Sequence, residues 1–154
     1  MKDLENRNCL VCDRIGLIIK GKNKYFVKEL VSGYVVLCDF QFYFGYTLFL
    51  SKTHVNELHK LSKRERYIFL KEMAKVAEAV YKTFKPKKLN YGLMGNTDTH
   101  IHWHLIPRYE NDLQPETAIW AVDKKIRCNK MSRPKEDQLK KMKERLLVEL
   151  NKLI

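Results

Sequence analysis

Apolar residues follow two kinds of spacing along the chain. In the first, short runs rich in β-branched and aromatic residues are separated by Gly33 and Gly45, and two further runs follow beyond residue 88. Such runs are typical of β-strands. The pattern predicts five strands, over residues 24–30, 33–38, 46–50, 89–94 and 100–106.

In the second kind of spacing, apolar residues recur at helical intervals. Ser62 forms a capping box with Glu65, and Pro86 ends the segment. The apolar positions between them lie on one face of a helix: Phe69, Met73, Val76, Val80 and Phe84. We therefore predict an amphipathic helix of about six turns over residues 62–85.

A second amphipathic helix is predicted at the C-terminal end of the chain. Ser132 and Pro134 mark its start. Its apolar face consists of Leu139, Met142, Leu146, Leu150 and Leu153. Strands, helix, strands and helix in this order predict an α+β fold with a mostly antiparallel sheet of about five strands.

The composition fits one globular domain over residues 1–154. Hydrophobic residues make up 45% of the chain and charged residues 31%, and 154 residues bury a core without disulfides. No apolar run is long enough to span a membrane. The first residues, M-K-D-L-E-N-R-N, lack the apolar centre of a signal peptide, which predicts a cytoplasmic protein. The four cysteines, two of them in C-L-V-C at 9–12, indicate metal binding or a reducing compartment.

The net charge of +12 is concentrated toward the C-terminus, where residues 123–154 hold eleven Lys and Arg against five Asp and Glu. Such a basic tail attracts polyanions, and nucleotides and nucleic acids both qualify. A solvated basic surface without a partner is equally compatible with this composition.

Three of the five histidines lie two residues apart in T-H-I-H-W-H-L-I-P-R-Y, residues 99–109. In a strand, His100, His102 and His104 share one face, because successive side chains alternate. Imidazole is suited to act as nucleophile, acid or metal ligand near neutral pH. The residues thus indicate a site, and leave covalent chemistry and metal binding both open.

The motif H-I-H-W-H-L-I resembles the His-φ-His-φ-His-φ-φ signature of the histidine triad (HIT) family of nucleotide hydrolases and transferases. C-L-V-C-D-R-I near the N-terminus and G-Y-T-L-F-L-S-K-T-H at 45–54 are similar to two other stretches of that family. The resemblance covers residues 9–109, and the basic tail over 123–154 has no counterpart. The resemblance implies a HIT-like fold, in which one long helix lies between residues 45–54 and the triad. It also implies a homodimer.

The resemblance also implies a reaction. In this family the middle histidine attacks the α-phosphorus of a nucleotide, and water then cleaves the nucleotidyl-histidine. Here His102 would be the nucleophile and His104 would lie near the leaving group. The substrate would be a dinucleoside polyphosphate or a nucleoside phosphoramidate, and no catalytic cofactor is expected.

Four further residues match substrate-contacting positions of the family. Asn96 and Thr97 would contact phosphate, and Asp39 would hold the ribose hydroxyls. Tyr46 stands where the family commonly has a fourth histidine. A phenol donates one hydrogen bond but carries no positive charge.

The resemblance further implies a structural zinc site. Its ligands would be Cys9, Cys12, His54 and His100, which match the zinc ligands of many family members. Two thiolates and two imidazoles are a common closed zinc set.

Two other functions remain compatible with the sequence. In the first, the protein would be a metal-dependent hydrolase in which the triad itself holds zinc or iron. A chelator would then abolish its activity. Alternatively, the chain would be a basic nucleotide- or nucleic-acid-binding module with little turnover, in view of Tyr46 and the basic tail.

Overall fold

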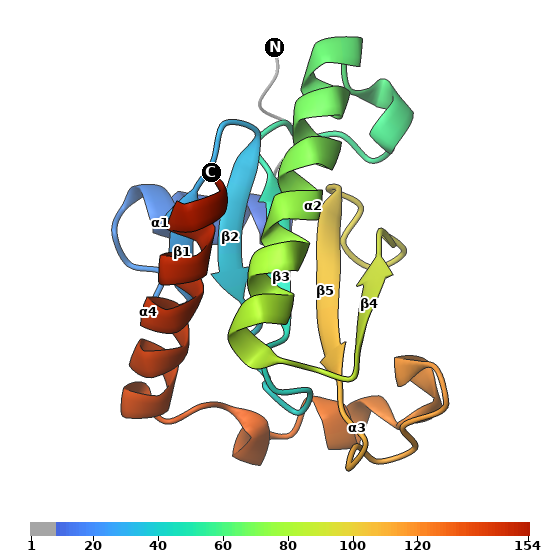
Figure 1. Ribbon diagram of the computed structural model, residues 1–154. Coiled ribbons are helices and arrows are strands. Elements are labelled where there is room, and N and C mark those ends of the chain that lie inside the picture. The colour runs from blue at the N-terminus through green and yellow to red at the C-terminus, as the bar shows by residue number, and fades with distance from the viewer. Residues whose placement is uncertain (1–8) are drawn as a thin grey trace.

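The structure, a computed structural model, describes residues 9–154, and its five strands form one antiparallel sheet (Figure 1). The strand order is β1-β2-β3-β5-β4. The strands are β1 (Phe26–Glu29), β2 (Gly33–Leu37), β3 (Thr47–Ser51), β4 (Lys88–Gly92) and β5 (His102–Arg108). The predicted α+β fold with a five-stranded antiparallel sheet is confirmed.

Two long helices, α2 (Lys63–Phe84) and α4 (Glu136–Leu153), cover one face of the sheet (Figure 1). Helix α2 packs on β3 and β5, whereas α4 packs on β1 and against α2. The rings of Phe49 on β3 and Phe69 on α2 stack with their centroids 5.0 Å apart. Burial of this apolar layer stabilises the sheet and both helices together.

The opposite face of the sheet carries a second apolar cluster under helix α1 (Leu10–Ile19) (Figure 1). Val11 of α1 belongs to this cluster with Val36 of β2 and Leu50 of β3. The sequence did not predict α1. Its start is capped by Cys9, whose Sγ accepts a hydrogen bond from the backbone N–H of Cys12 at 3.4 Å. The C-x-x-C motif thus sits at a helix N-terminus.

Strand β5 begins two residues later than the predicted 100–106. The backbone N–H of Ile101 donates to Val55 O, and its carbonyl accepts from Ser51 N. These bonds tie Ile101 to the last residue of β3 and to the loop that follows it. The other strands lie within about two residues of their predicted bounds, and the long helix agrees with residues 62–85.

The C-terminal helix begins at Glu136, so the predicted start near Ser132 is wrong. Arg133 has extended backbone angles (φ −71°, ψ 130°), as expected for a residue before a proline. Four short helices were also not predicted: η1 (Leu58–Lys60), η2 (Ile119–Ala121), α3 (Lys124–Arg127) and η3 (Lys130–Ser132).

Within residues 9–154, no helix combines the length and the apolar composition needed to cross a membrane. The expectation drawn from M-K-D-L-E-N-R-N concerns residues 1–8, which lie outside the described residues.

Candidate active site

Strand β5 places His102 and His104 side by side on the sheet face that α1 covers. Their ring centroids are 4.6 Å apart, and the rings meet edge to face. Leu105 on the same strand points to the opposite face, into the core under α2. The alternation predicted for these two histidines is therefore present, and it sets two imidazoles in direct contact.

His102 is buried, and its ring has one fixed hydrogen bond. Its Nδ1 lies 2.7 Å from the backbone carbonyl oxygen of His100. A carbonyl only accepts, so Nδ1 carries the proton when the ring is neutral. The lone pair is then on Nε2. This tautomer gives His102 an unprotonated ring nitrogen, which a nucleophile requires.

His104 contacts Tyr46, whose hydroxyl lies 2.5 Å from His104 Nδ1. Burial, reinforced by neighbouring His102, lowers the pKa of His104 to about 4. Its imidazole is therefore neutral at pH 7.

His100 lies apart from the other two histidines, in a cluster with Cys9, Cys12 and His54. Its Nδ1 is 3.6 Å from Cys9 Sγ and 3.3 Å from Cys12 Sγ, and Cys12 Sγ is 3.2 Å from His54 Nδ1. One ligand atom from each residue lies within 4.8 Å of all the others. The predicted zinc ligands are thus brought together.

The donor set fits one zinc ion. Tetrahedral zinc with Zn–S near 2.3 Å and Zn–N near 2.0 Å holds sulfur and nitrogen donors about 3.5 Å apart. His100 Nε2 donates to Ser51 O at 2.8 Å, which leaves Nδ1 unprotonated and aimed at the thiols. Burial lowers the pKa of His100 to about 4, so this nitrogen stays neutral. Burial and neighbouring Cys9 raise the pKa of Cys12 to about 12, so metal binding would displace its proton.

Asp39, predicted to hold ribose, lies in the loop after β2. Its Oδ1 binds Arg14 Nη1 of α1 at 2.6 Å, and Arg133 Nη1 lies 4.0 Å from Oδ2. Sequence reasoning missed Arg14. The pairing with Arg14 fixes Oδ1, whereas the ion pair of Oδ2 with Arg133 is longer.

Asn96 and Thr97, predicted to contact phosphate, lie in the loop between β4 and β5. Asn96 lines a cavity of about 300 Å³ together with Leu58, Met94 and Ile101. Within residues 9–154, the wall of that cavity contains none of the three triad histidines. Thr97 is exposed. The role of these two residues in phosphate binding stays a prediction.

Two residues near Tyr46 were not singled out from the sequence. Gln41 is buried and hydrogen-bonds the backbone on both sides of the turn before β3. Arg127 of α3 stacks on the Trp120 ring at 5.7 Å, and its charge lowers the pKa of Tyr46, although burial outweighs it. Neither belongs to a sequence motif, because their contacts form only in the folded chain.

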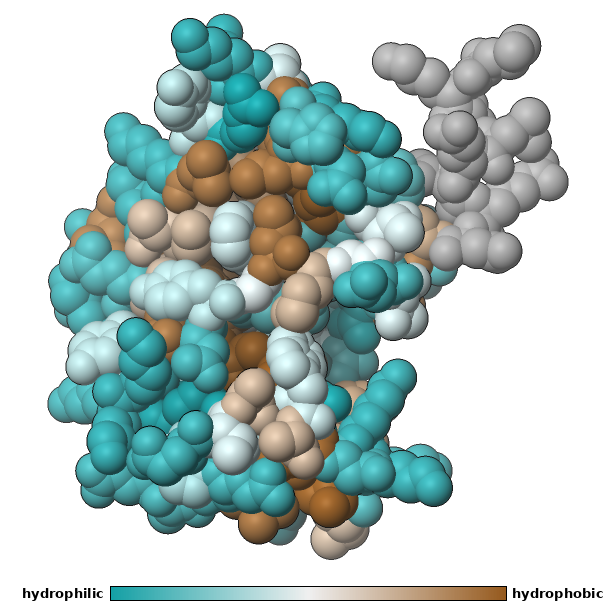
Figure 2. Space-filling view, turned by 90° about the vertical axis from the view of Figure 1, so that its right-hand side faces the viewer, coloured by the Kyte–Doolittle hydropathy of each residue, from teal (hydrophilic) through white to brown (hydrophobic). Residues whose placement is uncertain are grey.

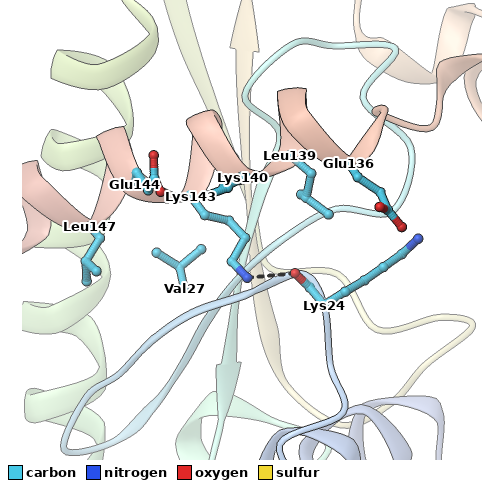
Figure 3. Close-up of a pocket in the computed structure, with 8 residues that line it drawn as sticks. All are labelled: Lys24, Val27, Glu136, Leu139, Lys140, Lys143, Glu144 and Leu147. Carbon is cyan, nitrogen blue, oxygen red and sulfur yellow. Dashed lines mark hydrogen bonds between the residues drawn. The ribbon is translucent and has the colours of Figure 1, made fainter.

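A cavity of about 390 Å³ lies between α4 and β1 (Figure 3). Lys143 Nζ donates to Lys24 O across it at 2.8 Å, and Leu139 and Val27 line its floor. Among residues 9–154, those that line this cavity include no histidine or cysteine. The chemistry-bearing side chains instead gather around β5.

The sequence matches the HIT domain family over residues 24–111. The match contains His54 and the three triad histidines. It does not include Cys9, Cys12 or the basic C-terminal segment. A search of curated proteins finds no match.

Solved structures with the same fold include histidine triad proteins from several organisms. One from Marinobacter aquaeolei VT8 has 20% identity and a TM-score of 0.70, covering 84% of this chain and 90% of its own. A zinc-bound member from Mycobacterium smegmatis has 20% identity and a TM-score of 0.66, covering 95% of each chain. The diadenosine triphosphate hydrolase of Plasmodium falciparum has 14% identity and a TM-score of 0.60, covering 84% of this chain and 78% of its own.

The family match spans more than half of the chain, and His102 and His104 of the triad lie on β5. The chain therefore belongs to the HIT domain family, whose name refers to the histidine triad.

Proposed function

We propose that the protein is a nucleotide hydrolase or transferase in which His102 attacks the α-phosphorus of the substrate. The observation that carries this proposal is the hydrogen bond from His102 Nδ1 to His100 O, 2.7 Å long. It fixes the tautomer with a free lone pair on Nε2, beside a second neutral imidazole. Nucleophilic catalysis needs an unprotonated nitrogen held in one orientation.

The reaction has two steps. In the first, the Nε2 lone pair of His102 forms a bond to the α-phosphorus, and the bond from phosphorus to the leaving group breaks with its electron pair. In the second, water attacks the same phosphorus and the N–P bond breaks. His102 regains its lone pair, and the proton of the water goes to solvent. Transfer to another acceptor follows the same course with an alcohol or phosphate in place of water.

Other residues have supporting roles in this proposal. Asp39 Oδ2 would accept hydrogen bonds from ribose hydroxyls, with Arg14 fixing the carboxylate. Tyr46 would act indirectly, by forming a hydrogen bond with His104, which would lie close to the leaving group. Asn96 and Thr97 remain predicted phosphate contacts. A dinucleoside polyphosphate or a nucleoside phosphoramidate would serve as substrate, and the neighbour from Plasmodium falciparum supports the first.

Substitution of His102 tests the proposal. We expect His102→Ala to lose turnover by at least about 10³-fold while keeping nucleotide affinity, because attack and binding use different groups. His59→Ala removes an exposed histidine and is the matched control. Near-normal turnover in His102→Ala would rule out the proposed nucleophile.

We also propose that Cys9, Cys12, His54 and His100 hold one structural zinc ion. Bound there, the ion would join α1, the loop after β3 and the chain that enters β5. Its role would be rigidity near the triad.

Zinc content and thermal stability test this proposal together. Wild type should carry about one zinc per chain, and Cys12→Ser should lose both zinc and several degrees of Tm. Cys128→Ser, which removes a thiol outside the cluster, should keep both. Wild type that stays zinc-free after reconstitution with zinc would contradict the proposal.

A metal-dependent hydrolase that uses all three histidines as ligands is less well supported. His100 Nε2 is bonded to Ser51 O and its Nδ1 faces the cysteines, so it does not converge with His102 and His104. Within residues 9–154, the group of side chains that fits a metal contains neither of those two. Turnover that persists in chelator would separate the two mechanisms.

The binding module with little turnover remains the second candidate, supported by the net charge of +12. Tight nucleotide binding without turnover across a panel of leaving groups would favour it. We propose a cytoplasmic location, because no disulfide joins the cysteines of residues 9–154, which suits a reducing compartment. Cell fractionation would test it.

A further inference from the structure

Tyr46 departs from the family motif, and the structure holds it rigidly at the turn that leads into β3. Its N–H donates to Tyr43 O at 3.0 Å, and its carbonyl accepts from Cys38 N at 2.9 Å and from Gln41 Nε2 at 3.0 Å. Gly45 precedes it with a φ of 90°, which favours glycine. The position of the phenol is therefore fixed by the backbone around it.

Gln41 holds this turn from inside. Its Oε1 accepts from Gly45 N at 2.8 Å, and its Nε2 donates to the carbonyl oxygens of Cys38 and Tyr46. All three bonds go to backbone groups, and Gln41 is 9% exposed. These bonds hold the backbone of Tyr46 in one position. Residues of a functional site need such support, because their geometry must be kept to within about 0.5 Å.

The bond between Tyr46 and His104 has one favourable direction. Within residues 9–154, the Tyr46 hydroxyl has His104 Nδ1 as its hydrogen-bond partner and no other. If Nδ1 donated, the phenolic proton of a largely buried side chain would have no acceptor, which costs free energy. If the phenol donates, both groups are satisfied. The proton of His104 then sits on Nε2.

We propose that Tyr46 is a positioning residue that holds His104 neutral with its proton on Nε2, so that the site acts on substrates whose leaving group departs as an oxyanion. The substrate class is thus nucleoside phosphoanhydrides, and nucleoside phosphoramidates with basic amine leaving groups are poor substrates. This inference rests on the proposed function of His102.

The chemistry of the leaving group carries the second half of the argument. When the P–O bond of an anhydride breaks, the electron pair stays on a phosphate oxygen, which is stable as an anion. His104 Nε2–H donates a hydrogen bond to that oxygen and keeps its proton. When a P–N bond breaks, the amine must gain a proton, and a neutral imidazole is a poor acid for this step.

The protonation state of the pair agrees with this picture. Burial keeps the pKa of His104 near 4 and raises the pKa of Tyr46 well above its ordinary value. At pH 7 the phenol therefore keeps its proton to donate, and the imidazole is neutral and lacks the acidic second proton of an imidazolium. A histidine at position 46 would offer a second basic nitrogen, and the pair of imidazoles would share a positive charge.

The tautomer of His104 tests the positioning role without reference to activity. In ¹⁵N-histidine-labelled protein at pH 7, protonated and unprotonated ring nitrogens are distinguished by chemical shift, and His104→Gln assigns the signals. We expect wild type to carry the His104 proton on Nε2 and Tyr46→Phe to populate both tautomers. Tyr81→Phe, which removes a half-exposed phenol on α2, should match wild type. A wild-type proton on Nδ1 would overturn the inference.

Substrate discrimination tests the functional half. The probes are a dinucleoside triphosphate and an alkylamine phosphoramidate of the same nucleoside, and the readout is the ratio of their kcat/KM values. Since general acid catalysis contributes about 10²- to 10⁴-fold, we expect Tyr46→His to narrow the wild-type ratio by at least about 10-fold. Tyr81→Phe should leave the ratio unchanged. An unchanged ratio in Tyr46→His would overturn the inference even if turnover is normal.

The two failures can be told apart. If wild type turns over neither probe, the proposed function fails, and this substrate assignment fails with it. If it turns over both through His102 but with equal kcat/KM, the proposed function stands and the assignment to anhydrides is wrong.

Discussion

His102 and His104 have the same residue type and the same strand face, yet their Nδ1 atoms meet different partners. One faces a backbone carbonyl and the other a phenol. Strand alternation was enough to predict from the sequence that these two share a face. It did not predict the contacts of His100, which precedes the strand and meets the cysteines at the start of α1. Hydrogen-bond partners of this kind come from distant segments and leave no local signature.

Acid should destabilise the protein in part through His104. The pKa of its folded form is about 4, below the ordinary histidine value of 6.5, so the unfolded chain binds more protons between these values. The free energy of unfolding should therefore fall as the pH decreases from about 6.5 to 4. Urea unfolding across this range should show a smaller decrease in His104→Gln than in wild type. His59→Gln, at an exposed position, is the control. Equal slopes in wild type and His104→Gln would contradict the assignment.

Long periodic elements were predictable at the scale of helices and strands, whereas short ones were not. The bounds of helix α2 agree with the predicted ones, because its capping box, its apolar face and the proline that ends it are all local features of the sequence. Helix α1 has ten residues and is capped by a cysteine, which is not a usual capping residue. The resemblance identified its C-x-x-C motif as metal ligands and did not indicate that a helix begins there. The short helix η2 packs through Ile119 on Tyr43 and Ile106, which are distant in the sequence.

Glu72 of α2 connects the helix to the β1–β2 turn, and its removal should destabilise the fold. Its carboxylate is 7% exposed and accepts hydrogen bonds from Val31 N, Ser32 N and Ser32 Oγ. Glu72→Ala should lower the free energy of unfolding by about 2–3 kcal/mol, because hydrogen bonds to a buried charge are lost.

The matched control for Glu72 is Glu78→Ala on the same helix. Glu78 forms an exposed ion pair with Lys82, and such pairs contribute little to stability because water screens them. Urea denaturation of the two variants gives both values. Similar losses in the two would show that the turn does not depend on Glu72.

At the scale of the whole molecule, the sheet leaves β4 as an edge strand with an apolar neighbourhood. Figure 2 shows brown patches across this side of the molecule, between polar margins. Tyr91 and Trp120 are each more than half exposed there. The expectation that residues 1–154 form one domain stays a prediction; α4 packs on β1 and α2, which is in keeping with it.

We expect a homodimer that covers the β4 edge, because an open strand and exposed aromatic residues favour self-association. Light scattering should give about twice the 18.4 kDa mass of one chain. Tyr91→Glu should shift the protein toward a monomer, whereas Val148→Glu, on the exposed side of α4, should not. A wild-type mass of one chain at micromolar concentration would show that the dimer does not form.

Covalent attack by His102 is the central claim, and trapping the intermediate tests it most directly. Wild type is mixed with a dinucleoside triphosphate, quenched during turnover under conditions that preserve a phosphorus–nitrogen bond, digested and weighed by mass spectrometry. We predict that the mass of one nucleotide is attached to the peptide that contains residues 100–104, on His102, and that His102→Ala lacks it. A water activated by metal gives no such adduct, and neither does a binding module. Turnover by the wild type without labelling of His102 under these conditions would contradict the mechanism.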